Sequence, residues 1–277
     1  MAAPNYEQIQ SFDHVTEQLK QAAIDEFLSE VDETMRLDDV LEVATRIAEK
    51  FAFLGAELGA QWYDLCTQLA GIEAEPAEIQ EPDPDGLRAK AESTVKASQK
   101  PFVETFEYYM QNVINDSIRK TGDANLWRDY MRGLSPGKWA RVPVGDTCAW
   151  CLMLASQGAW YLTEESAVGD GDHYHNGCNC KAVYHADAES INGYSGKLGK
   201  YKAMYYSAEN IREAAESGKE PYPEELAMRI AKAEAMHGAR EAAKKAEAEA
   251  NGETYVEQQW TQYNVDLIIM RDKYGLK

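Results

Sequence analysis

Five potential metal ligands in one short segment constrain this chain more than any other feature. Four of its five cysteines lie within 33 positions, and a histidine stands between the two pairs; the set is Cys148, Cys151, His175, Cys178 and Cys180. The C-x-x-C pair lets two thiolates from one turn reach the same ion, commonly with the second at the start of a helix. The H-x-x-C-x-C run offers three further donors from a tight loop. The pattern therefore predicts a local metal knot.

Zinc is the metal that best fits these donors, because structural zinc sites use four thiolate or imidazole ligands in a tetrahedron. Five candidates leave one unused, so the site holds either four cysteines or three cysteines and His175. We favour the mixed set, because His175 has no other evident role. A satisfied, thiolate-rich site leaves no open position for a reacting water. We expect one structural zinc per chain, which staples a segment too small for its own core.

Disulfides and unrelated thiols are the alternatives to metal. The first ten residues are polar and do not resemble a secretory signal, so we expect folding in a reducing cytosol, where clustered cysteines more often bind metal. A protein carried out of the cell inside a particle would also lack such a signal. Cys66 lies far from the cluster in a helical pattern and is expected to be a buried, small apolar residue.

The charge balance of the chain limits the kinds of partner that it can bind. The chain has 28 basic and 47 acidic residues, a formal net charge of −19, so direct binding to nucleic acid is not expected. No stretch approaches the roughly 18 consecutive apolar residues of a membrane span. No feature indicates a small-molecule substrate. Docking onto another protein is the expected mode of action.

Apolar residues at three- and four-residue steps predict an N-terminal helical hairpin within residues 1–72. The two stripes are Phe12, Val15, Leu19, Ala23, Phe27 and Val31, and then Val40, Val43, Ile47, Phe51, Leu54, Leu58, Trp62 and Leu65. Residues 73–86 contain three prolines and six carboxylates, which cannot sustain a buried element. They predict a linker, which forms either a domain boundary or an extended arm.

Residues 87–134 form an aromatic-rich helical region in which Pro101 should start a new helix or kink the existing one. Thr121-Gly122-Asp123 is expected to end that helix, and a short helix should follow over 126–134. Residues 135–200 are predicted to be a small α+β region that carries the zinc knot, with strands at 138–144 and 159–162 and a helix at 152–157.

Residues 201–277 form a C-terminal helical region. A helix is expected at 203–217, and a long one should begin after Pro223 and end at Gly252. The last segment fits helix and strand equally well. The whole chain is thus predicted to be mostly α, with a small zinc-stapled α+β insert.

Enzymatic motifs are missing from the sequence. It contains no phosphate-binding loop, nucleophile elbow or H-E-x-x-H pair. Asp172-His173, near Asn176 and His185, faintly resembles a zinc-stapled HNH nuclease, but the second C-x-x-C of such folds is absent and the acidic composition suits a nuclease poorly. We expect a protein that is not an enzyme.

The cysteine segment also carries a family resemblance. The run from Arg141 through Cys148-Ala-Trp-Cys151 and Gly158-Ala-Trp-Tyr161, followed by His175-x-x-Cys178-x-Cys180, resembles the minor head proteins of tailed bacteriophages. These are the Mu gpF-like head morphogenesis proteins and their relatives in phages of actinobacteria. The match covers about 45 residues, from 141 to 185. Asn179 stands where the family usually has a basic residue, which argues against contact with nucleic acid from that loop.

The resemblance implies a structural protein present in few copies per virion. Such a protein is made in the host cytoplasm and resides in the head interior or at the portal vertex. Its partners would be the portal and the major capsid protein, with roles in head assembly, packaging or genome delivery. A cellular zinc-stapled adaptor that joins other proteins is the alternative.

Overall fold

The computed structural model describes most of the chain in two compact units. The described residues are 2–32, 34–98, 100–145, 147–161, 180–252 and 254–276, with only the backbone described at 159–161. The first unit comprises Met1–Asp146 and Gln157–Gly196, and the second comprises Thr147–Ser156 and Lys197–Lys277. Each unit is described by itself. The predicted five-part division of the chain stays a prediction.

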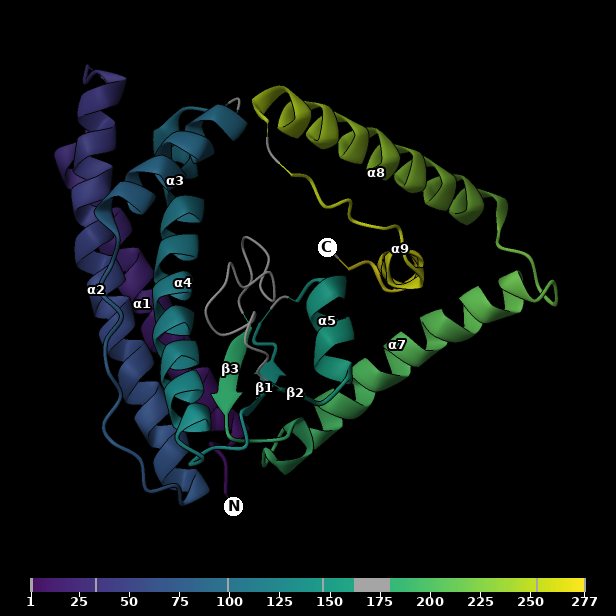
Figure 1. Ribbon diagram of the computed structural model, residues 1–277, viewed down its shortest axis with the longest axis horizontal. Coiled ribbons are helices and arrows are strands. Elements are labelled where there is room, and N and C mark those ends of the chain that lie inside the picture. Colours follow the sequence, from purple (N-terminus) through teal and green to yellow (C-terminus); the bar gives the residue numbers. More distant parts are fainter. Residues whose placement is uncertain are drawn as a thin grey trace. The chain divides into compact units, whose positions relative to one another are not determined.

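Three long helices, α1 (Tyr6–Glu30), α2 (Leu37–Ala70) and α4 (Phe102–Met131), lie side by side in the first unit (Figure 1). The start of α1 is closed by a capping box, in which Asn5 and Gln8 each accept a hydrogen bond from the backbone N–H of the other at 2.9 Å. A six-residue connection leads from α1 to α2, and the two helices pack on each other. The N-terminal pair of helices is as predicted.

Small residues, rather than the predicted leucines, line much of the buried face of α2. Leu54, Leu58 and Leu65 keep part of their surface exposed, whereas a row of alanines and glycines is buried. A Cβ atom added at Gly59 would lie 2.5 Å from the carbonyl oxygen of Ile118 on α4. The backbones of α2 and α4 therefore approach each other so closely that only small side chains fit between them.

Aromatic side chains fill the space where α1 meets the start of α4. The rings of Phe27 and Phe106 stack with centroids 3.7 Å apart, and Phe102 meets Phe27 edge-on. Phe102, Phe106 and Tyr109 are each at most 5% exposed. The aromatic run of this region is thus core, as expected, although Tyr108 faces outward.

The helix α4 does not end at Thr121-Gly122-Asp123. A break there was predicted because glycine disfavours helix interiors, but α4 continues to Met131. A Cβ atom at Gly122 would lie 2.1 Å from the hydroxyl of Tyr184, which is buried against the helix. Gly122 is therefore a packing position, and the prediction of a second short helix was wrong. Pro101 does precede the first turn of α4, and the helix before it, α3, spans Pro84–Ala97.

The acidic segment between α2 and α3 is an extended strap, defined here as residues 73–83. Asn125 on α4 clasps its backbone: Asn125 Oδ1 accepts from the N–H of Glu78 at 2.9 Å, and Asn125 Nδ2 donates to the Glu78 carbonyl at 2.8 Å. Arg128 donates to the carbonyls of Glu75 and Pro76. These contacts supply the backbone partners that the strap lacks within itself. The structure shows an extended arm at 73–83, whereas residues 84–86 of the predicted linker begin α3.

A three-stranded antiparallel sheet packs against α2 and α4, with the strands in the order β2-β1-β3. The strands are β1 (Lys138–Val142), β2 (Ala159–Tyr161) and β3 (Lys181–Tyr184). The first two were predicted, but β3 was not. Ala140 pairs with Ala159 on one side and with Val183 on the other. The indole N–H of Trp62 on α2 donates to the Ala182 carbonyl at 2.7 Å, which ties β3 to the helices. A short 3₁₀ helix, η1 (Ala188–Ser190), follows the sheet.

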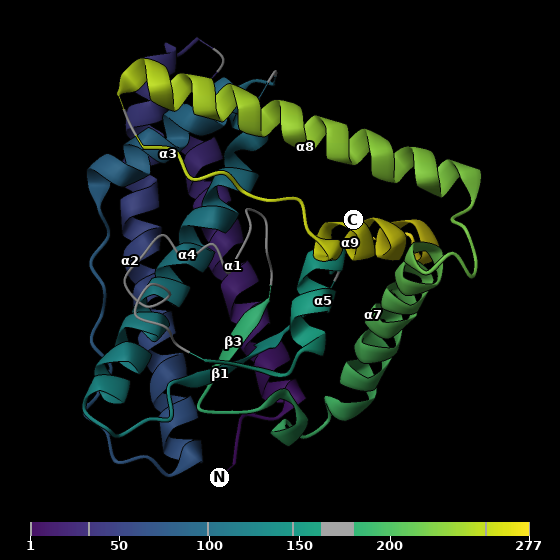
Figure 2. The ribbon, with the colours of Figure 1, turned by 45° about the vertical axis from the view of Figure 1, so that its right-hand side comes forward.

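The described residues of the second unit form four helices. They are α5 (Ala149–Ser156), α7 (Ser195–Glu216, entering from the end of the first unit), α8 (Glu224–Asn251) and α9 (Gln262–Tyr274). As predicted, α8 begins after Pro223 and ends at Gly252, whose φ of 72° suits a residue without a Cβ atom. The last segment, which fitted helix and strand equally well, is helical. Helix α9 contacts both α5 and α8 (Figure 2) and forms a buried ion pair with α7, in which Arg212 Nε lies 2.8 Å from Asp266 Oδ1.

The described part of the chain is therefore mostly helical, with a small sheet, as predicted. None of its helices has the length and apolar character needed to span a lipid bilayer.

Replacing Gly59 by alanine should destabilise the first unit. The added methyl group meets backbone atoms of Ile118, so the two helices must separate, and we expect a loss of about 1–3 kcal/mol. Hydrogen exchange of α4 amides, with urea unfolding of the whole chain, measures the effect. Gly238→Ala is the control, because this helical glycine of α8 has no atom within 4 Å of its added Cβ atom. Unchanged α4 protection in Gly59→Ala would contradict the close approach of α2 and α4.

Candidate functional site

The first cysteine pair lies at the start of α5, as the C-x-x-C spacing predicted. Cys148 immediately precedes the helix and Cys151 is its third residue. The backbone N–H of Cys151 donates to Cys148 Sγ at 3.4 Å, and the N–H of Leu152 donates to the Cys148 carbonyl at 3.1 Å. Amides at the positive end of a helix stabilise a thiolate, the form that binds metal. Cys151 is buried and Cys148 half-buried.

The second group of predicted ligands is only partly described. Cys180 lies directly before β3 and is 5% exposed. His175 and Cys178 fall outside the described residues, as does His173. Within the portion that the structure does describe, no three His, Cys, Asp or Glu side chains form a group that could hold a metal. The five-residue ligand set and its zinc therefore stay a prediction.

Cys66 is a core residue, as predicted. It is fully buried in α2, and burial raises the pKa of its thiol to about 12. A thiol that stays protonated at neutral pH is a poor metal ligand and a poor nucleophile.

His185 has a structural position. Its Nδ1 lies 2.9 Å from Ser135 Oγ and its Nε2 lies 3.1 Å from Thr67 Oγ1. The residue is 2% exposed, and burial lowers the pKa of its imidazole to about 4. The ring is therefore neutral at pH 7 with both nitrogens engaged. It is not available to activate water or to bind a catalytic cation, as the nuclease alternative would require.

The side chain of Tyr63, which is hydrogen-bonded to Asp129, packs against the His185 ring. The Tyr63 ring lies 5.2 Å from the imidazole, and its hydroxyl donates to Asp129 Oδ2 at 2.7 Å. Arg128 Nε donates to the other oxygen of Asp129 at 2.9 Å. Burial, and then the Asp129 carboxylate, raise the pKa of Tyr63 above its usual range. Because the carboxylate is paired on both oxygens, this network holds α2, α4 and the end of β3 together without an unsatisfied charge.

Sequence reasoning missed the buried lysine of β3. Lys181 is 3% exposed, and its Nζ lies 3.0 Å from Asp13 Oδ1 on α1 and 3.5 Å from Asn115 Oδ1 on α4. Burial lowers the pKa of Lys181, and the Asp13 charge opposes that shift. A lysine in a run of strand-forming residues was the only available signal, since Asp13 and Asn115 lie in unremarkable helical positions.

Asp123 is a further perturbed group beneath the sheet. The Tyr184 hydroxyl donates to Asp123 Oδ1 at 3.1 Å. Burial raises the pKa of Asp123 to about 6, while the Tyr184 hydrogen bond and the charges of Arg119 and Arg141 act in the opposite direction.

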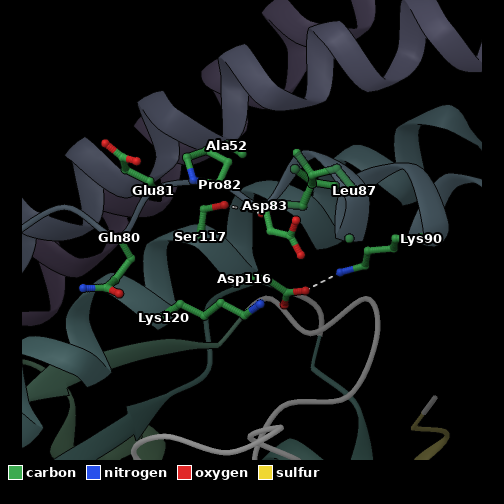
Figure 3. Close-up of a pocket in the computed structure, with 12 residues that line it drawn as sticks. Ala52, Gln80, Glu81, Pro82, Asp83, Leu87, Lys90, Asp116, Ser117 and Lys120 are labelled. Atoms are coloured by element: carbon green, nitrogen blue, oxygen red, sulfur yellow. Dashed lines mark hydrogen bonds and ion pairs between the residues drawn. The ribbon is translucent and has the colours of Figure 1, made fainter.

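A cavity of about 190 Å³ lies where the strap meets α3 and α4 (Figure 3). Charged side chains of both signs line it: Lys90 pairs with Asp116, and Asp83 and Lys120 lie close by (Figure 3). The volume is below the roughly 300 Å³ of ordinary ligand pockets, and the wall charges largely neutralise one another. The cavity suits a few water molecules better than an organic substrate.

Taken together, these features define a helical scaffold with a small sheet, held by buried polar contacts. Residues 3–208, about three quarters of the chain, match the family model described as VG15 protein. The chain therefore belongs to the VG15 protein family, a viral gene-product family, and this membership indicates a phage-encoded protein. No curated protein and no solved structure matches the chain.

His185 and Asp123 should affect stability in opposite directions below pH 6.5. The folded pKa of His185 is lowered, so the unfolded chain binds more protons and stability falls between pH 6.5 and about 4, by about 3 kcal/mol. The folded pKa of Asp123 is raised, so its contribution rises as the pH falls below about 6. We expect Asp123→Asn to lose more stability than the wild type between pH 7 and pH 4.5, and His185→Asn to lose less.

Urea unfolding at both pH values measures these differences, and comparison of the variants cancels the effects of other titrating groups. Asparagine suits position 185, because it tolerates the positive φ of 60° found there. Identical acid sensitivity in the wild type and both variants would contradict the raised pKa of Asp123 and the lowered pKa of His185.

Proposed function

We propose that this chain is a structural minor head protein of a tailed bacteriophage. It would associate with the portal or the major capsid protein during head assembly, packaging or genome delivery. The observation that carries the proposal is the family match over residues 3–208, which includes the whole cysteine segment. That segment is also where the chain resembles Mu gpF-like head morphogenesis proteins.

The second unit supports a docking role. Helix α8 is 28 residues long, yet its buried residues are only Leu226, Glu241 and Ala248. Met228 and Met236 are each more than half exposed. A helix with so little apolar contact gains little stability from its own unit, and it suits a helix that packs on another protein. The net charge of −19 favours protein over DNA as the partner.

Zinc would act as a structural staple in this protein. Four of Cys148, Cys151, His175, Cys178 and Cys180 would hold it, and the helix-start position of Cys148 favours the thiolate form that zinc requires. A four-ligand site of this kind supplies folding free energy rather than Lewis acidity.

Two other functions remain as alternatives. A cellular zinc-stapled adaptor would share the helices and the knot, but membership of a viral family argues against it. In the HNH-like nuclease reading His185 would be a catalytic residue, but both of its ring nitrogens are engaged by Thr67 and Ser135. Magnesium-dependent DNA cleavage that His173→Ala abolishes would favour the nuclease over the head protein.

Assembled heads should contain this chain. When it is co-produced with the portal, scaffold and major capsid proteins of its own phage, we expect it in purified heads at few copies relative to the capsid protein. Quantitative mass spectrometry of the heads measures that ratio. A phage lacking the gene should give particles that are defective in assembly, packaging or infection. Infectious particles that form normally without the chain would contradict the proposal.

Zinc content should follow the cysteine cluster. Elemental analysis is expected to find about one zinc per chain, and Cys148→Ser or Cys151→Ser should lose most of it, because a three-ligand site binds far more weakly. Cys66→Ala is the matched control: it removes a thiol that is buried and protonated, and it should retain the metal. A metal-free chain with two disulfides would overturn the zinc proposal.

A further inference from the structure

Three side chains from three separate elements of the first unit meet at one point. Asp13 comes from α1, Asn115 from α4 and Lys181 from β3. Lys181 Nζ lies 3.0 Å from Asp13 Oδ1 and 3.5 Å from Asn115 Oδ1. The contact with Asp13 is an ion pair rather than an aligned hydrogen bond. The Lys181 amine thus lies within reach of both a carboxylate and a carboxamide.

The surroundings keep bulk water away from this point. Lys181 is 3% exposed and Asn115 is 6% exposed. A space of about 10 Å³, about that of one water-sized molecule, lies among them and is lined on its apolar side by Phe12, Trp62 and Ile118. Reacting groups held next to each other in a fixed geometry, shielded from bulk water, gain a large rate advantage over the same groups in solution.

We propose that Lys181 and Asn115 form an intramolecular amide bond, with Asp13 as the catalytic proton carrier. This self-modification does not depend on the function proposed above. It would attach β3 covalently to α4, across 66 positions of sequence.

The step balances without an oxidant or a cofactor. Asp13 takes a proton from the Lys181 ammonium group, and the freed amine attacks Cγ of Asn115, one C=O bond length (about 1.2 Å) beyond the contacted oxygen. A C–N bond forms to Nζ, and the bond from Cγ to Nδ2 breaks. Protonated Asp13 gives its proton to the departing nitrogen, and Asp13 then takes the second proton that Nζ loses as the amide forms. It passes this proton to the released ammonia, which leaves as ammonium, and the Asp13 carboxylate is restored. The chain loses the mass of one ammonia, about 17 Da.

The test is the intact mass of the purified full-length chain, measured after reduction and treatment with a chelator. We expect a mass about 17 Da below that of the sequence, and a branched peptide in which residue 181 is joined to residue 115. The branched peptide is the decisive evidence, because the loss of mass alone could also come from cyclisation of an asparagine elsewhere, which likewise releases ammonia. An ordinary ion pair would leave the mass unchanged.

Four variants separate the roles. Lys181→Arg keeps the charge but lacks the amine, and Asn115→Ala lacks the acyl group, so both should show the unmodified mass. Asp13→Asn keeps the shape but lacks the base and should also stay unlinked, whereas Asp13→Glu should restore part of the linkage. Asn112→Ala is the matched control: Asn112 is buried to the same degree one turn earlier on α4, and its loss should leave the linkage intact.

Circular dichroism establishes that each variant is folded before its mass is compared. A wild-type chain without the branched peptide overturns the proposal, whatever the variants do. Linkage of residue 181 to residue 13, with a loss of about 18 Da, would also overturn it, because Asp13 would then be the acyl donor and water the leaving group. Full linkage in folded Asp13→Asn would remove the catalytic role of Asp13.

Discussion

The close approach of α2 and α4 is the contact on which the first unit depends. Because Gly59 has no side chain, the backbone of Ile118 can pack directly against it. The other small residues of α2 let the two helices approach closely along much of their length. That approach places Trp62 against the edge of β3 and Tyr63 beside Asp129. Three short strands are described in the sheet, too few to bury a core alone, so their stability comes from this helical surface.

Specific polar contacts help to define how the sheet meets the helices. The Trp62 indole, the Tyr184 hydroxyl and the His185 ring each have a specific partner. Such contacts are costly when one partner is lost, because a buried polar group without a hydrogen bond is strongly disfavoured. They therefore select one register of β3. They also explain why the perturbed pKa values of this unit belong to groups that hold the fold and need not indicate catalysis.

Sequence reasoning succeeded where the signal was local. The apolar periodicity predicted α1 and α2, Pro101 and Pro223 preceded helices, and Gly252 ended one. It failed where a residue served a distant partner. Gly122 resembled a helix end because its partner, Tyr184, lies 62 positions away and is visible only in the fold. The strand β3 was missed for a similar reason. It is only four residues long, and it is recognisable as a strand mainly because it pairs with β1.

The sequence by itself determined the mostly helical class of the fold and the place of the C-x-x-C pair at a helix start. The position of that pair is a property of a short stretch, since neighbouring residues alone bring Cys148 and Cys151 to the same turn. The tertiary structure decided that the acidic segment is a strap clasped by Asn125 and that His185 is buried. It also decided that Lys181 meets Asp13 and Asn115. These outcomes depend on contacts between residues tens of positions apart, which only the packing of α1, α2, α4 and the sheet creates.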